Sequence, residues 1–245
     1  FVREKDFGLI EVAPGIRSDL GLKFSTLVSY NNLDGMNKRI TFQGTVNRRF
    51  DLNLLDDQRR QSNKQLFEYD TSINFLESHI FNTQMDFTLS GSLARRRFVS
   101  YDADIKRVSY TFSSDIASWL SVSLKQQLEV VSQFNATNED NEGHFQIGSF
   151  TPGFNLNFKD RDVSPRSGAE FDFSLEIANP FFLSQENDEL TINYYKFMNR
   201  NKFYVPVNDK VVFAMSAALG VQENLAREQD YIPGIKVFRL TGADI

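Results

Sequence analysis

The chain of 245 residues contains no cysteine, two histidines, one tryptophan and no long apolar run. The absence of cysteine excludes disulfides and thiolate metal sites. The most apolar stretch, residues 211–221, is eleven residues long and is interrupted by Ser216. A membrane-spanning helix needs roughly 18 consecutive apolar residues. The sequence therefore excludes a helical membrane protein.

Catalytic motifs are also missing. His79 and His144 are far apart in the sequence, and there is no Gly-x-Ser-x-Gly elbow, phosphate-binding glycine loop or His-Glu-x-x-His helix. The acidic residues are spread along alternating segments, which is typical of a wetted surface rather than of paired catalytic carboxylates. We expect no enzyme activity, no cofactor and no metal. The net charge of −5 gives no reason to expect a nucleic-acid partner.

Alternation of apolar and polar residues is the strongest positive signal. In residues 169–178 one face carries Phe171, Phe173, Leu175 and Ile177, and the other carries Glu170, Asp172, Ser174 and Glu176. Most soluble strands have about five or six residues, whereas about 9–11 tilted residues cross a bilayer. The segment therefore predicts a membrane-spanning strand whose four large apolar side chains face lipid.

The same pattern predicts eleven strands, at residues 7–17, 22–31, 39–50, 65–77, 84–98, 105–117, 120–134, 144–159, 169–179, 190–207 and 211–221. The even-numbered connections are short, whereas several odd-numbered ones, such as 51–64 and 135–143, are longer and more polar. Outer-membrane barrels show this asymmetry. The predicted fold is all-β, an antiparallel transmembrane β-barrel. The alternative is a soluble β-sandwich or lipocalin-like barrel, in which no such asymmetry is required.

One connection is more specific. Asp160 and Arg161 are followed by Pro165 and then by Gly168, which precedes the strand at 169–179. Proline fixes φ in a tight turn, and glycine supplies conformational freedom before the strand. This arrangement resembles the periplasmic turn before the ninth strand of the BamA/TamA outer-membrane assembly superfamily.

The start of the chain extends the resemblance. Val2 to Lys5 followed by Phe7 and Gly8 resembles that family's junction between the last periplasmic POTRA domain and the barrel. The resemblance implies that residues 1–6 end a POTRA domain and that residues 7–245 form the N-terminal part of the barrel. Residues 31–35 resemble the family's Asn-x-x-Gly turn between strands two and three.

The end of the chain also fits. Phe238, Leu240 and Gly242 resemble the Phe-x-Leu-Gly-Gly stretch that opens the sixth external loop, although Thr241 replaces a usual glycine. The family's Arg-Gly-aromatic motif is expected beyond Ile245. The resemblance implies sixteen strands, so five would follow this chain. This agrees with the even strand count of single-chain bacterial barrels and with the instability of open sheet edges in lipid.

The resemblance implies a function in the bacterial outer membrane, namely the insertion and folding of other β-barrel proteins. The implied partners are outer-membrane lipids including lipopolysaccharide, client β-barrel proteins and periplasmic accessory lipoproteins. A polypeptide-secretion pore of the same superfamily and a passive porin are alternatives within the barrel fold. A soluble β-sandwich binding protein is the alternative outside it.

The first strand carries the predicted mechanism. Pro14 removes a backbone donor and Gly15 weakens pairing, so the strand from Gly8 onward is expected to pair poorly with the last strand of the barrel. In the resembled family this lateral seam opens, and its edge templates incoming strands by β-augmentation. The alternative is a kink or bulge with no gating role.

Arginine clusters give a second candidate site. Arg48, Arg49, Arg95, Arg96 and Arg97 fall near the predicted external ends of strands. Guanidinium groups bind phosphate oxygens in a bidentate manner, so these residues are candidate lipid-phosphate contacts. The alternative is that they are solvated charges on the rim.

Overall fold

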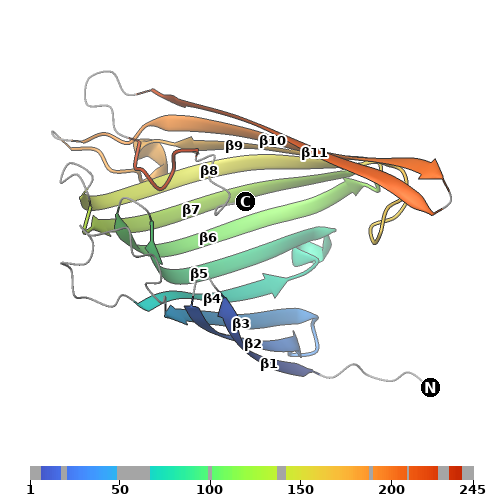
Figure 1. Cartoon of the computed structure of the whole chain (residues 1–245), viewed down its shortest axis with the longest axis horizontal. Helices are drawn as coiled ribbons and strands as arrows, with labels where there is room; N and C mark the ends of the chain where they lie inside the picture. The colour runs from blue at the N-terminus through green and yellow to red at the C-terminus, as the bar shows by residue number, and fades with distance from the viewer. Residues whose placement is uncertain are drawn as a thin grey trace. The chain divides into compact units, whose positions relative to one another are not determined.

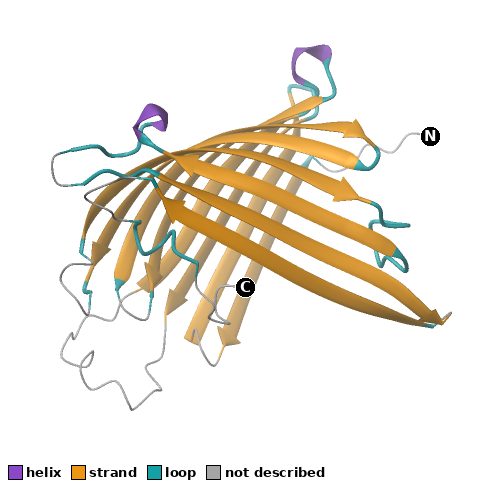
Figure 2. Cartoon of the chain, turned by 90° about the horizontal axis from the view of Figure 1, so that it is seen from above, coloured by secondary structure: helices purple, strands orange, loops and turns teal. Residues whose placement is uncertain are grey.

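The structure is a computed structural model that describes residues 7–17, 21–48, 67–98, 101–136, 142–187, 190–208, 210–225 and 232–238. Most of these residues lie in strands (Figure 2). Several predicted features lie outside the described residues, namely the POTRA end at residues 1–6, the loop at 51–64, Arg49, Leu240 and Gly242. In the described residues, no helix is long and apolar enough to cross a membrane.

The described residues form eleven strands, which confirm the predicted all-β antiparallel fold. They are β1 (Gly8–Arg17), β2 (Gly21–Leu33), β3 (Lys38–Arg48), β4 (Phe67–Glu77), β5 (Met85–Arg97), β6 (Asp102–Ala117), β7 (Leu120–Phe134), β8 (Gly143–Asn157), β9 (Gly168–Ala178), β10 (Tyr194–Asn208) and β11 (Val211–Asn224). One-turn 3-10 helices η2 (Ile80–Asn82) and η4 (Pro180–Phe182) interrupt two connections. The strands follow one another in a single sheet (Figure 1). Among the described residues, β1 and β11 each have one neighbouring strand, so the sheet is not closed.

The chain divides into two compact units. The first comprises residues 1–78, 88–108 and 129–145, and the second comprises residues 79–87, 109–128 and 146–245. The first unit contains all of β1 to β4, and the second contains all of β9 to β11.

In the first unit, large apolar side chains stand in register on one face. Ile10 lies opposite Val28, Val28 opposite Phe42, and Phe42 opposite Ile73. All four are exposed, from 39% for Val28 and Phe42 to 73% for Ile10. The other face is polar, for example where Gln43 lies opposite Ser72. A continuous exposed apolar face of this kind requires an apolar medium or a partner.

The second unit has the same two-faced organisation. On the apolar face, the rings of Phe154 and Phe173 are stacked with their centroids 4.5 Å apart. On the polar face, Asn155 lies opposite Asp172, which lies opposite Arg200. The four apolar residues predicted at 171–177 all share the face of Phe173, because side chains alternate along β9.

Candidate functional site

The candidate site is the outer edge of β1. The ladder between β1 and β2 pairs all ten residues, from Gly8 opposite Tyr30 to Arg17 opposite Gly21, without a register shift. Pro14 and Gly15 therefore form no bulge against β2. The lateral opening predicted for this strand depends on a closing strand and stays a prediction.

The hydrogen-bonding pattern between β1 and β2, which we call the phase of the ladder, shows which side of β1 the nitrogen of Pro14 faces. The N–H of Asn31 donates to the carbonyl of Phe7 at 2.6 Å. In an antiparallel pair, hydrogen-bonded and non-hydrogen-bonded positions alternate. The odd residues of β1 therefore bond to β2, and the even residues direct their N–H and C=O groups to the free edge. The nitrogen of Pro14 faces that edge, so the proline removes an edge donor and leaves the β1–β2 ladder intact.

Gly15 has a smaller role. No atom lies within 4 Å of the position where a Cβ would stand, and Gly15 is not among the positive-φ residues of the described chain. Neither a close approach nor a left-handed conformation requires glycine here. Gly8 is similar, because a Cβ would lie 4.0 Å from the carbonyl of Ser29.

The predicted turn motif forms a compact loop between β8 and β9. One carboxylate oxygen of Asp160 accepts the backbone N–H groups of Arg166 at 2.9 Å and Ser167 at 3.2 Å. Gly168 has φ +107°, and a Cβ there would lie 2.1 Å from the carbonyl oxygen of Phe158. Glycine is therefore required at this position, and Asp160 holds the loop that leads to it.

The carboxylate of Asp160 makes this turn sensitive to acid. The backbone hydrogen bond from Ser167 is the main cause that holds the pKa of Asp160 below its usual value, and Arg166 and Arg161 act in the same direction. A carboxyl group with a lowered folded-state pKa stabilises the fold above its unfolded-state pKa of about 4. This stabilisation is lost as the pH falls through the folded-state pKa.

We therefore expect Asp160→Asn to lower the midpoint of denaturant unfolding at neutral pH, because the charged acceptor is lost. The difference from the parent should shrink as the pH falls from about 4 towards 2, where the carboxyl group of the parent becomes protonated. Unfolding curves of both proteins across this range measure the effect. A difference that stays the same at all pH values would contradict it.

The arginines of β5 have carboxylate partners. Arg95 binds Asp104 in a bidentate manner, with distances of 2.5 and 2.6 Å, and Arg96 binds Asp70 at 2.7 Å. Arg97 lies 3.9 Å from Asp102. Phosphate binding at this cluster stays a prediction, and a phosphate would have to compete with these carboxylates.

Arg48, the other described member of the predicted phosphate-binding set, ends β3. Its guanidinium group lies over the ring of Phe67, 5.7 Å from the centroid. A contact between Arg48 and a lipid phosphate stays a prediction.

Residues 232–238 form a site that sequence reasoning missed. Lys236 is buried, and its ammonium group lies 3.2 Å from the carboxylate of Glu176 in β9. Its carbonyl accepts a hydrogen bond from Lys196 of β10 at 2.9 Å. Tyr194 donates to the same Glu176 carboxylate at 2.9 Å. These contacts place residues 232–238 on the polar face of β9 and β10.

A glycine in β11, Gly220, makes room for a further contact between residues 232–238 and the polar face. The ring of Phe238 lies 4.2 Å from the ammonium group of Lys196. A Cβ at Gly220 would stand 2.6 Å from that ring, so glycine at this position makes room for it. Of the three residues predicted to open the sixth loop, Phe238 is therefore docked on the polar face. The alternation of small residues along β11 is the sequence signal that could have indicated a docked segment.

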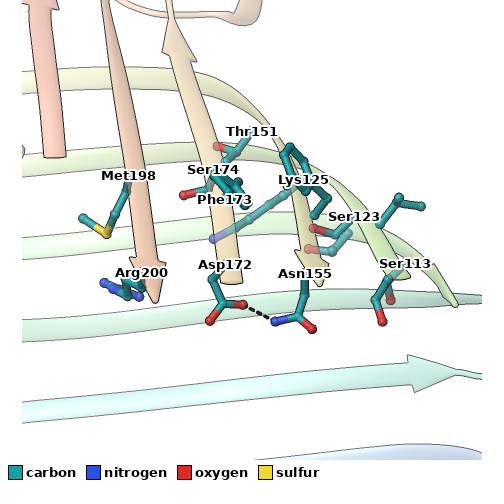
Figure 3. A pocket seen from close by; sticks show the side chains of 15 residues that line it. Ser113, Ser123, Lys125, Thr151, Asn155, Asp172, Phe173, Ser174, Met198 and Arg200 are labelled. Atoms are coloured by element: carbon teal, nitrogen blue, oxygen red, sulfur yellow. Dashed lines mark hydrogen bonds between the residues drawn. The ribbon is translucent and has the colours of Figure 1, made fainter. Parts of the chain in front are cut away.

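The polar face also contains a cavity of about 430 Å³. Serine, threonine and charged side chains from β6 to β10 line it, including Ser123, Lys125 and Arg200 (Figure 3). Asn155 donates to the carboxylate of Asp172 at 2.5 Å across its wall. Hydroxyl, amide and charged groups on one face and exposed apolar groups on the other are the arrangement of a barrel wall between water and lipid.

The fold and the two-faced wall define an outer-membrane β-barrel. A scan of protein families matches residues 32–243 to the Omp85 superfamily domain. The chain therefore belongs to the Omp85 superfamily.

Solved structures show the same fold. BamA from Haemophilus ducreyi lacking POTRA domains 1–3 is similar with a TM-score of 0.73 and 15% identity, over 99% of this chain and 46% of that one. CdiB from Escherichia coli is similar with a TM-score of 0.62 and 13% identity, over 90% of this chain and 41% of that one. This chain thus spans less than half the length of either protein. No curated protein sequence matches it.

Proposed function

We propose that this chain is part of a barrel that inserts and folds other β-barrel proteins in the bacterial outer membrane. The observation that carries the proposal is the outer edge of β1, which is fully paired to β2 on one side. On its other side, the even residues offer the N–H groups of Gly8, Ile10, Val12 and Ile16 to a further strand. The process as proposed needs no nucleotide, metal or catalytic residue.

The physical basis is strand pairing in a medium without water. A backbone hydrogen bond contributes about 0.5–1.5 kcal/mol in a folded protein, and unpaired backbone groups cost several kcal/mol each in hydrocarbon. A client strand that pairs with β1 satisfies its own backbone and that of the edge together. Pro14 leaves one gap in the row of donors, which limits how strongly any strand, including a closing strand of the same barrel, binds here.

A polypeptide-secretion pore is the second candidate. The cavity beside Lys125 and Arg200 on the polar face favours it. In that case a chain would travel along the polar face rather than pair with β1. Client β-barrel proteins, lipopolysaccharide and periplasmic accessory lipoproteins are the partners that the assembly function would involve.

The register offers a direct test by photo-crosslinking in cells. Ala13 of β1 lies opposite Ser25 of β2, and the two side chains share the polar face. We would place a photoreactive amino acid at Ala13 or at Ser25 of the full-length protein and express a client barrel. The assembly function predicts crosslinks from position 13 to the terminal strands of the client. Position 25 is the matched control, because β1 and β3 flank it on both sides.

Equal client crosslinking from positions 13 and 25 would contradict pairing at the edge. Crosslinks from Lys125 or Arg200 to an exported polypeptide, with none from position 13, would favour the secretion pore. Depletion of the protein with unchanged levels of outer-membrane barrels would also oppose the assembly function.

A further inference from the structure

The connection between β9 and β10 folds back against the barrel wall. We call residues 179–187 the clip. Asn179 accepts a hydrogen bond from the N–H of Phe182 through its side chain, which fixes the one-turn helix η4. The ring of Phe182 is stacked on Phe150 of β8, with centroids 5.5 Å apart. Because Phe150 shares the apolar face with Phe154, the clip lies against the apolar face of the second unit.

Gly148 lets the clip lie directly on β8. A Cβ at this position would stand 1.7 Å from the carbonyl oxygen of Phe182. The hydroxyl of Ser184 donates to the carbonyl of Gly148 at 2.7 Å and accepts its N–H at 3.1 Å. Ser184 is itself buried. Glycine and serine therefore form a two-way attachment that a larger residue at position 148 would break.

Two glutamines of the wall form hydrogen bonds with backbone groups of the clip. Gln126 of β7 donates to the carbonyl of Phe182 at 3.4 Å, and Gln146 of β8 donates to the carbonyl of Leu183 at 3.0 Å. Gln146 also accepts the N–H of Gln185 on its carbonyl at 2.8 Å. The carbonyls of Phe182 and Leu183 and the hydroxyl of Ser184 thus point to the wall, whereas Glu186 and Asn187 at the end of the clip are exposed.

Two apolar side chains of the clip, those of Phe181 and Leu183, point away from the protein. Phe181 is 85% exposed and Leu183 is 60% exposed. Leu183 has φ +74°, a left-handed conformation that is uncommon for leucine. In water, a loop would expose its serine and amide groups and bury phenylalanine and leucine. Residues 181–184 of the clip have the opposite arrangement, which is stable where the surrounding medium is apolar.

We propose that the clip is a membrane anchor, with Phe181 and Leu183 inserted among the acyl chains of the leaflet at the end of the barrel where β9 ends. The apolar face of β8 and β9 continues directly from Phe150 to the clip, so lipid that wets this face also reaches Phe181. The occupant is lipid rather than a protein partner, because the exposed side chains extend the lipid-facing surface and are held by a preformed attachment. This inference depends on the barrel fold and is independent of the proposed assembly function.

Depth-dependent fluorescence quenching tests the anchor. The full-length protein with Trp119→Phe is reconstituted in phosphatidylcholine vesicles, with or without brominated acyl chains, and Phe181→Trp is compared with this parent. The added tryptophan should emit at shorter wavelength than in water and lose most of its emission in the brominated vesicles. Val163→Trp is the matched control, because Val163 is 81% exposed in the β8–β9 turn; its emission should be lost to aqueous iodide instead.

A second pair of variants, each made in the Phe181→Trp background, tests the attachment. Gly148→Ala should lift the clip and abolish the quenching of the introduced tryptophan by brominated lipid. Gly153→Ala lies in the same strand on the polar face, where a Cβ would stand 2.9 Å from the hydroxyl of Ser123 and 3.3 Å from the carbonyl of Phe173. Rotation of the Ser123 side chain relieves the closer contact, so quenching should persist. Quenching of the introduced tryptophan by iodide, or its protection from both quenchers, would overturn the anchor. Unchanged lipid quenching in Gly148→Ala would overturn the role of the attachment.

Discussion

Substitution of Gly168 by alanine is expected to destabilise the protein by about 3 to 5 kcal/mol. Two effects combine. The backbone has φ +107°, which an L-residue rarely adopts, and the new Cβ would stand 2.1 Å from the carbonyl oxygen of Phe158. That carbonyl belongs to the backbone, so it cannot move aside without displacing the end of β8. The β8–β9 hairpin should therefore close incorrectly or not at all.

The measurement is the midpoint of guanidinium unfolding in detergent, together with the fraction of protein that shows heat-modifiable mobility on gels. Gly15→Ala is the matched control, because a Cβ at position 15 meets no atom within 4 Å. Replacing glycine by alanine within a strand should leave stability unchanged or raise it by up to about 1 kcal/mol. Equal stability of the two variants would show that the turn does not constrain Gly168.

The second large effect concerns the phase of β1. Ala13→Pro should detach β1 from β2, whereas Val12→Pro should leave the two strands paired. The N–H of residue 13 faces Ser25, so a proline there removes a ladder bond and leaves the carbonyl of Ser25 unpaired, at a cost of about 1–3 kcal/mol. The N–H of residue 12 faces the free edge, as the nitrogen of Pro14 does. A proline there removes an edge donor only.

Amide hydrogen exchange separates the two outcomes. The amides of Lys23 and Ser25 should exchange rapidly in Ala13→Pro and stay protected in Val12→Pro. For the assembly function, Val12→Pro should reduce crosslinking of client strands to β1 while the barrel stays folded. If the two prolines have equal effects on exchange, the assigned phase of the ladder is wrong.

Most of the fold was predictable because alternation is a local property. β7 spans the predicted residues 120–134, and β9 differs by one residue at each end. The larger differences between the predicted and observed strand ends occur where residues distant in the sequence determine the boundary. β6 begins at Asp102 rather than at residue 105, because the acidic residues that resemble a turn in sequence are paired with Arg95 and Arg97 of β5.

The start of β10 shows the same limit. It begins at Tyr194 rather than at residue 190, because the preceding residues pair locally. Glu186 forms a bridge with Thr191, and the N–H of Asn187 donates to the carbonyl of Leu190. Residues 190–193 alternate between apolar and polar side chains as a strand does, so the local pattern does not separate this bridge from the start of β10.

The candidate site was predictable in part. Pro14 indicated an edge strand and Gly168 indicated a turn. Both could be read from the sequence because their effects come from their own backbone, not from distant partners. The contact between Lys236 and Glu176 joins residues 60 apart in sequence. Such a pairing depends on the register of β9 to β11, which no local pattern contains.

The docked segment at residues 232–238 has a consequence for transport. It is joined to β11 by a short stretch of the same chain, so its effective concentration at Glu176 and Lys196 is of the order of millimolar, as for any short tether. A free polypeptide moving along the polar face would have to displace this internal competitor from the carboxylate that Lys236 occupies. Passage along that wall is thus coupled to release of the segment.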